Sequence, residues 1–418
     1  VMNKLLCAGG AAIALTAASP AAAAGFDIKI GGDADFTAGY VSQSYDTSGQ
    51  PKGDFTNRFR INVTPTATAD NGMEYGASLR FRAYAANGTI DAQRAYLFAD
   101  GGLGRVEAGA IAGPNGQYGI TAPGNFGTGG VIGEWAMGPG WLTNQNTFLE
   151  PAFGYGFDAI TDTTWATRIN YFTPRFFAQS DTALGLMGAL SFAPRILDLG
   201  ASANRVRTIT TTGQSYCAAT LPSTPLSGCG YRNVIEAGLI WDGEIGDVTL
   251  SASLGYQHGE SPSDSSGVAY HPLQAYQAGL LLSWEGFEIG GSYLDAGKSS
   301  YARNRGYYLN DQTAVTAGLS YHTGPWSVGF NYIHGEDAGD VTVPGKRTAD
   351  MYSVGVTYTV AAGLTTSLEY LRSLTANEPG YKTDAFGNDA RGTPATPGDI
   401  GYGSGNGTLV LWKTILTF

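Results

Sequence analysis

The sequence predicts an all-β protein, a transmembrane antiparallel β-barrel of sixteen strands. Three observations support this prediction. From residue 26 onward, sixteen stretches alternate apolar residues with polar or small ones, as strands with one apolar face do. The links between the stretches alternate between very short and mostly long, which is typical of a barrel whose short turns share one rim. Aromatic residues recur near the ends of the apolar faces, where two membrane–water interfaces would lie.

Seven short links are expected at one rim of the barrel and eight longer links at the other. The short ones are residues 69–72, 100–104, 178–181, 242–247, 284–287, 322–325 and 360–363. An even number of strands brings both ends of the sheet to the short-turn rim, where the first and last strands can pair.

The two faces of each stretch differ in polarity. In residues 58–67, Phe59 and Ile61 alternate with Arg58 and Arg60. A soluble sandwich or barrel is the alternative, and it would bury the apolar set. A soluble fold does not explain why aromatic residues lie at the strand ends. We therefore expect the apolar set to face lipid and the polar set to line the interior.

The first 24 residues have the pattern of a cleaved secretory signal peptide, with Lys4, a small apolar run and an A-x-A site near Ala24. Residues 25–418 are expected to form a single barrel domain. Loss of Lys4 changes the formal net charge from −11 to −12, which does not support a basic nucleic-acid-binding face.

Outside the first 24 residues there are two cysteines, Cys217 and Cys229, and both lie in one expected loop. A disulfide is expected between them in an exported chain, and two free thiols are the alternative. A metal site would need more ligands than this pair provides. No metal and no cofactor is expected.

Two short motifs and the final residue carry a family resemblance. Residues 94–97 read RAYL, residues 168–176 read RINYFTPRF, and the last strand ends in Phe418. With the sixteen strands and the long third loop, they resemble the general diffusion porins of Gram-negative outer membranes, particularly those of α-proteobacteria. The resemblance implies a water-filled outer-membrane channel for passive diffusion of small hydrophilic solutes and ions, surrounded by outer-membrane lipid.

The resemblance also implies a homotrimer, which we expect to form through strands one to five, although the second loop (residues 85–89) is short. A substrate-selective porin for a sugar or small anion is the alternative function. An outer-membrane barrel hydrolase is a remote one, because no Ser–His–carboxylate grouping is evident around the four histidines.

The longest link, residues 112–163, is expected to fold inward as the constriction loop of such a channel; a surface loop is the alternative. The candidate wall residues are six arginines in the inward phase of strands two to five: Arg58, Arg60, Arg80, Arg82, Arg94 and Arg105. The candidate loop residues are Glu134, Glu150, Asp158 and Asp162. Opposed rows of these charges would set up a field across the passage and sort ions. The sequence leaves the ion preference open.

Overall fold

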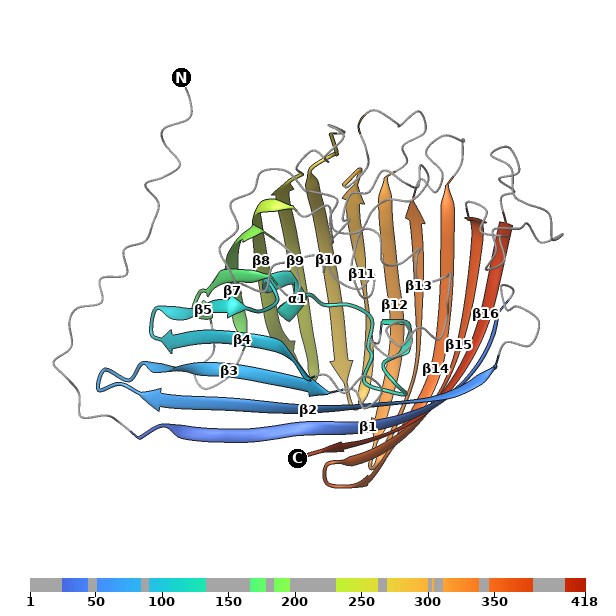
Figure 1. Ribbon diagram of the computed structural model, residues 1–418, viewed down its shortest axis with the longest axis horizontal. Helices are drawn as coiled ribbons and strands as arrows, with labels where there is room; N and C mark the ends of the chain where they lie inside the picture. Colours follow the sequence, from blue (N-terminus) through green and yellow to red (C-terminus); the bar gives the residue numbers. More distant parts are fainter. Residues whose placement is uncertain are drawn as a thin grey trace.

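A computed structural model describes residues 25–43, 51–83, 90–132, 166–177, 184–195, 231–261, 269–299, 303, 311–337, 346–378 and 403–418. Within these ranges, sixteen antiparallel strands close into one barrel (Figure 1), which confirms the expected fold class. Each strand pairs with its neighbours in sequence, and β1 pairs with β16 to close the sheet.

The first eight strands are β1 (Asp27–Gln43), β2 (Gly53–Thr68), β3 (Glu74–Ala83), β4 (Ile90–Gly101), β5 (Gly104–Ala110), β6 (Thr167–Phe172), β7 (Gly185–Arg195) and β8 (Arg232–Ile245). The second eight are β9 (Val248–Glu260), β10 (Leu273–Trp284), β11 (Phe287–Gly297), β12 (Gln312–Thr323), β13 (Trp326–Asp337), β14 (Arg347–Ala361), β15 (Leu364–Glu378) and β16 (Gly403–Thr417). Two short helical turns, α1 (Pro114–Tyr118) and η1 (Gly130–Ile132), follow β5. Among the described residues, no helix is long and apolar enough to cross a membrane.

Six of the seven expected short links are described, and each is a tight connection between consecutive strands. Figure 1 shows those from β8 to β15 at the lower rim. Five of the six are shorter than expected, because the strands continue until only two residues separate them: 102–103, 246–247, 285–286, 324–325 and 362–363. For example, β8 continues to Ile245, so the turn expected over residues 242–247 contains only Gly246 and Asp247. The polar sequence DGEIGD suggests a loop, but Gly246, at a φ of +63°, makes a two-residue turn possible. The expected link 178–181 lies outside the described residues.

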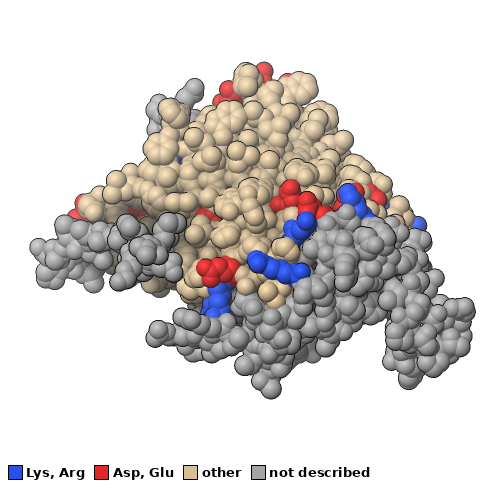
Figure 2. Space-filling model, turned by 90° about the horizontal axis from the view of Figure 1, so that it is seen from above, with Lys and Arg blue, Asp and Glu red and all other residues tan. Residues whose placement is uncertain are grey.

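The apolar phase of the strands faces outward. Phe59 is 42% exposed whereas its neighbour Arg58 is 4% exposed, although both lie in β2. The same contrast holds for the outward residues Leu190, Leu239, Leu254, Val354 and Leu368, all of which are exposed. In Figure 2 most described atoms on the face shown belong to uncharged residues, and charged atoms gather in a few places. A soluble fold would bury these side chains, so the barrel presents a lipid-facing surface.

Aromatic side chains mark both ends of this outward surface. Phe287 packs on Trp284 and Tyr321 beside the short turns, with ring centroids 6.3 Å and 4.3 Å apart. Tyr332 and Tyr352, 4.9 Å apart, pack together nearer the other rim. Such belts place amphipathic rings at the two membrane interfaces.

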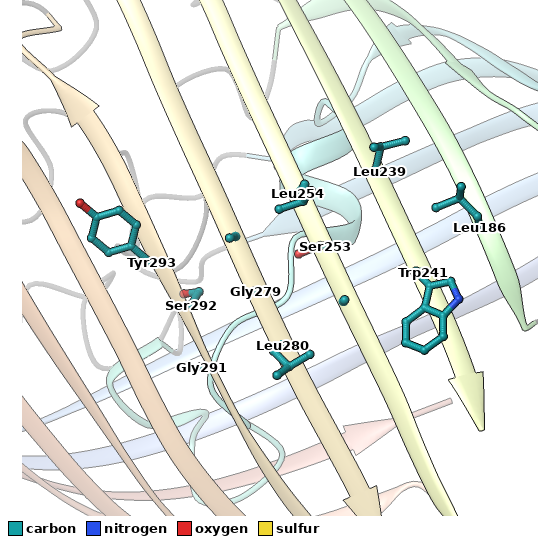
Figure 3. Close-up of a pocket in the computed structure, with 12 residues that line it drawn as sticks. Leu186, Leu239, Trp241, Ser253, Leu254, Gly279, Leu280, Gly291, Ser292 and Tyr293 are labelled. Carbon is teal, nitrogen blue, oxygen red and sulfur yellow. The ribbon is translucent and has the colours of Figure 1, made fainter. Parts of the chain in front are cut away.

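A hollow of about 510 Å³ lies on the exterior of β7–β11 (Figure 3). The side chains of Leu239, Leu254 and Leu280 border it, with Trp241 toward the short turns. All four belong to the outward phase of their strands, and the hollow therefore faces the membrane rather than the lumen.

Candidate functional site

Residues 111–132 leave β5 and follow the inner wall of the barrel. α1 contacts β7, β8 and β9, and η1 contacts β13, β14 and β15. Between them, the Ile120 N–H donates to Ser253 Oγ on β9 (2.9 Å), and the Ala122 N–H donates to Thr316 Oγ1 on β12 (3.2 Å). We call residues 112–132 the wall segment. It is the first part of the expected loop 112–163, whose remainder lies outside the described residues.

Glycines in the inward phase of the strands make room for the wall segment. A Cβ at Gly255 would lie 2.3 Å from Asn115 Oδ1, and one at Gly279 would lie 2.0 Å from the Ile120 carbonyl oxygen. The wall segment approaches six such positions: Gly238, Gly255, Gly279, Gly318, Gly329 and Gly355. These glycine contacts were not predicted from the sequence, although glycines in the middle of several strands, all in the polar phase, are a signal that could have indicated them.

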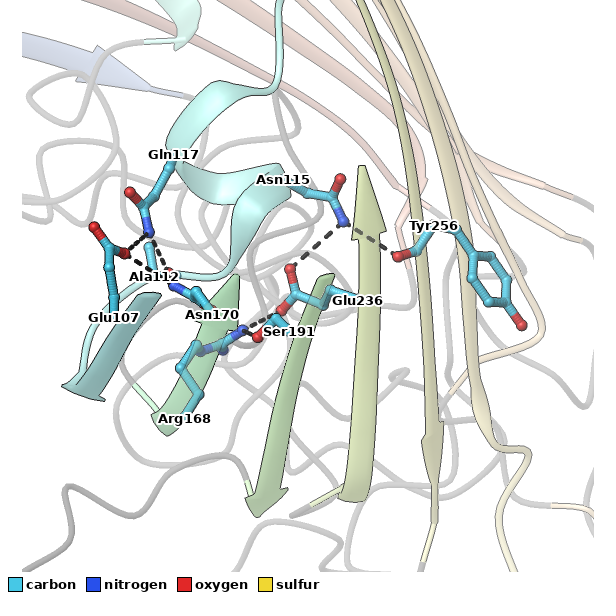
Figure 4. A network of polar contacts seen from close by, with 9 residues as sticks. All are labelled: Glu107, Ala112, Asn115, Gln117, Arg168, Asn170, Ser191, Glu236 and Tyr256. Atoms are coloured by element: carbon cyan, nitrogen blue, oxygen red, sulfur yellow. Dashed lines mark hydrogen bonds and ion pairs between the residues drawn. The ribbon is translucent and has the colours of Figure 1, made fainter. Parts of the chain in front are cut away.

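The base of the wall segment rests on a buried ion pair (Figure 4). Arg168 on β6 and Glu236 on β8 lie 2.5 Å apart, with side chains that are 0% and 1% exposed. Asn115 Nδ2 donates to the Tyr256 carbonyl oxygen (3.2 Å) and lies 3.5 Å from Glu236 Oε2. A buried pair of this kind holds its elements together, because removal of one partner leaves an uncompensated buried charge.

A second carboxylate secures the other side of the same base. Gln117 Nε2 donates to Glu107 Oε2 (2.9 Å) and to the Ala112 carbonyl oxygen (2.8 Å). Asn170 Nδ2 donates to the same two acceptors, at 3.2 Å and 2.9 Å. These side chains from β5, β6 and α1 meet in one network, which Figure 4 draws beside the ion pair.

The far end of the wall segment closes around Glu369 of β15. The carboxylate accepts hydrogen bonds from the Thr128 N–H (2.5 Å), Thr128 Oγ1 (2.6 Å), the Gly130 N–H (3.3 Å) and Ser353 Oγ (2.8 Å). Gly127 and Gly130 have φ values of +55° and +68°, and the turn they form directs the Thr128 and Gly130 N–H groups to the same carboxylate oxygen. Such concave backbone nests bind anions, and here the anion is a wall carboxylate.

Asn331 and a phenyl ring complete this contact. Asn331 Oδ1 accepts the Val131 N–H (2.9 Å), and its Nδ2 donates to the Pro123 carbonyl oxygen (3.1 Å). Phe126 is 1% exposed and lies directly over Gly329 and Gly355. The wall segment is therefore fixed to β5–β9 at its base and to β12–β15 at its far end.

Five of the six predicted arginines lie on β2–β4, outside the stretch β5–β15 that holds the wall segment. Arg58 pairs with Asp35 (3.4 Å) and Arg60 pairs with Asp33 (2.8 Å). The register then sets Arg82 opposite Arg60.

The same register sets Arg80 opposite Arg94. Arg80 Nε donates to a neutral acceptor, Asn62 Oδ1 (2.7 Å). Directly opposed like charges repel, so this part of the wall presents concentrated positive potential.

A comparison with protein families agrees with this geometry. The family model described as Gram-negative porin matches residues 10–377. The chain belongs to the Gram-negative porin family. Its fold and family are those of an outer-membrane channel and not of an enzyme.

Relatives and solved structures of porins extend this likeness. An uncharacterized protein of Rickettsia typhi is 23% identical, covering 88% of this chain and 90% of its own length. An anion-selective porin from Comamonas acidovorans is 15% identical with a TM-score of 0.59, covering 94% of this chain and 100% of its own. OmpT of Vibrio cholerae in a trimer form is 11% identical with a TM-score of 0.54, covering 94% and 99%.

The sixth predicted arginine stands apart from the porin's arginine wall. Arg105 lies beside the short turn between β4 and β5, where it pairs with Glu107 (2.9 Å) and Asp100 (3.4 Å). Its guanidinium also lies 4.4 Å from the centre of the Phe98 ring. The structure thus places five of the predicted arginines together on β2–β4 and Arg105 apart from them on β5.

Several predicted residues fall outside the described part of the porin. These are the loop carboxylates Glu134, Glu150, Asp158 and Asp162 and the cysteine pair Cys217 and Cys229. The wall segment itself contains no charged residue.

One Ser–His–carboxylate grouping does exist, although sequence reasoning found none. Ser327 Oγ hydrogen-bonds to His322 Nδ1, and His322 Nε2 lies 3.8 Å from Glu288. That separation exceeds a hydrogen bond, and the same carboxylate binds Asn125 and Ser320. The grouping lies at the short-turn end of β11–β13 and ties the wall segment to the porin wall. Within the described ranges, no three potential metal ligands group together.

Proposed function

We propose that this porin is a water-filled channel for passive diffusion of small hydrophilic solutes and ions, with a preference for anions. The arginines opposed on β3 and β4 carry this proposal. A sixteen-stranded barrel has a lumen too wide for its own side chains to fill, so an inward segment sets its width.

We infer that the passage runs between the wall segment and the inner face of β16 and β1–β4. The contacts of the wall segment that position it are with β5–β15. In this proposal the wall segment gives solutes an uncharged surface on one side, opposite the arginine wall. Positive potential in a narrow, poorly screened passage raises the local concentration of anions.

Two expected features remain part of the proposal. A cleaved signal peptide over residues 1–24 would deliver the chain for insertion. A homotrimer would form through β1–β5, whose outward faces carry small residues such as Ala34, Ala77 and Ala95. Light scattering in mild detergent tests the trimer, and a monomer would contradict it.

Selectivity in planar bilayers tests the channel. The double variant R80Q/R94Q removes two opposed positive charges, so the reversal potential in a salt gradient should shift toward cation preference. The shift should be greatest near 0.01 M salt, where the Debye length is about 30 Å. R175Q serves as the matched control, because Arg175 pairs with Asp242 (2.6 Å) at the short-turn end of β8, away from β2–β4. An equal reversal potential in the wild type and R80Q/R94Q would overturn the assignment of these arginines.

A further inference from the structure

One outward row of side chains is polar where the surrounding exterior is apolar. Strand register sets Tyr332 opposite Tyr352, and Tyr352 opposite Arg372. It then sets Arg372 opposite Thr408, and Thr408 opposite Ser42. The row is continuous across β13, β14, β15, β16 and β1.

The last part of this row contains two cations and two hydroxyl groups. Arg372 Nη1 donates to Thr408 Oγ1 (2.8 Å), and Lys52 Nζ donates to Ser42 Oγ (3.3 Å). The Val41 N–H donates to the Lys52 carbonyl oxygen (2.7 Å), which holds the start of β2 against β1. We call Arg372, Thr408, Ser42 and Lys52 the basic row.

The basic row begins where the lipid-facing surface ends. Two residues closer to the short turns on the same faces lie Tyr370, Val410 and Tyr40, of which the two tyrosines are 48% and 50% exposed. The row lies toward the long-loop rim, which in outer-membrane barrels faces outward from the cell. Its side chains therefore reach the headgroup region of the outer leaflet.

We propose that the basic row binds the phosphate of an anionic lipid headgroup. A guanidinium, an ammonium and two hydroxyl groups are donors suited to phosphate oxygens. Arg372 has five N–H donors, so its contact with Thr408 leaves others for a ligand. The acyl chains of that lipid would lie against the apolar faces immediately below.

Two carboxylates of the same rim, Asp350 and Glu336, are engaged elsewhere. Asp350 accepts hydrogen bonds from the Tyr332 hydroxyl (2.5 Å) and from His334 (2.8 Å). Glu336 pairs with Lys346 at 2.5 Å. Both lie on the β13–β14 side, so the positive end of the row is over β15, β16 and β1. Its position on the exterior separates this site from solutes in the lumen.

The proposal is tested by measuring which lipids stay bound to the porin after its release from nanodiscs. The porin is reconstituted in nanodiscs with equal phosphatidylglycerol and phosphatidylcholine, and the lipids that stay bound after release are counted by native mass spectrometry. Wild type should retain phosphatidylglycerol selectively. K52Q/R372Q should weaken this retention about 25-fold, because each cation near an anionic lipid contributes about fivefold. Inorganic phosphate at millimolar concentration should not displace the lipid, since it lacks the acyl chains.

Matched variants keep the result interpretable. K298Q removes an exposed cation just beyond the long-loop end of β11, outside the row, and should retain lipid like the wild type. T408V keeps the side-chain shape, removes one hydroxyl and should weaken retention about fivefold. Heat-dependent gel mobility shows that each variant is folded, and single-channel conductance should not change. Equal retention of both lipids by the wild type, or wild-type retention by folded K52Q/R372Q and T408V, would overturn the proposal, as would displacement by inorganic phosphate.

Discussion

Replacement of Gly329 by alanine should narrow the passage without dismantling the barrel. A Cβ at this position would lie 2.1 Å from Cδ1 of the Phe126 ring. Ordinary contacts between carbon atoms are about 3.5–4.0 Å, so the ring must retreat by at least about 1.4 Å. β13 is bonded on both sides to β12 and β14, whereas Phe126 belongs to the wall segment. The wall segment therefore moves first.

The size of the effect follows from overpacking. Adding a methyl group to a filled site destabilises it by about 1–3 kcal/mol. Docking of the wall segment against β13 and β14 would then weaken about 5- to 150-fold. Because the displaced wall segment moves away from β13 and into the passage of our proposal, single-channel conductance should fall. The largest sugar that enters porin-containing liposomes should also become smaller.

A double-mutant cycle isolates the contact. F126A removes the ring, so G329A should add nothing further in the F126A background. G188A is the matched control on another strand, since the nearest atom to its Cβ is 3.5 Å away. If G329A lowers conductance equally with and without the Phe126 ring, or not at all, the contact does not set the passage width.

Four further predictions concern other parts of the porin. E236Q leaves Arg168 buried beside a neutral amide, and the heat-unfolding midpoint should fall by the equivalent of about 3–5 kcal/mol; an unchanged midpoint would contradict the role of the ion pair. E369Q replaces the carboxylate that accepts from Thr128 and Gly130, so current noise in single-channel records should increase, and S353A should have the smaller effect. L254R places a charge on the lipid face and should destabilise the inserted barrel by about 2–4 kcal/mol, as measured by denaturant titration in vesicles. Burial, then Arg303 and Lys298, lower the pKa of His271, which lies between β9 and β10. The folded protein therefore favours the neutral imidazole, and this contribution to stability is present above the unfolded pKa and is lost as pH falls toward the folded value; an NMR titration midpoint at or above 6.5 would refute it.

Strand number and strand phase were predictable from the sequence. Alternation is a local property with a period of two, and the membrane requires one face to be apolar throughout. The outward position of Phe59 and the inward position of Arg58 can therefore be predicted from the alternation alone, without knowing which strand pairs with theirs. The same reasoning placed Arg80 and Arg82 on the inner wall, because each belongs to the polar phase of its own strand.

The anchors of the wall segment depended on tertiary structure. Thr128 and Glu369 are separated by 241 residues, and nothing within β15 distinguishes this glutamate from any other polar residue of the lumen. The role of Gly329 likewise depends on tertiary structure, because this glycine makes room for the Phe126 ring only where the wall segment crosses β13. The path of a segment across a closed barrel is decided by contacts with many strands at once, and no local periodicity encodes such contacts.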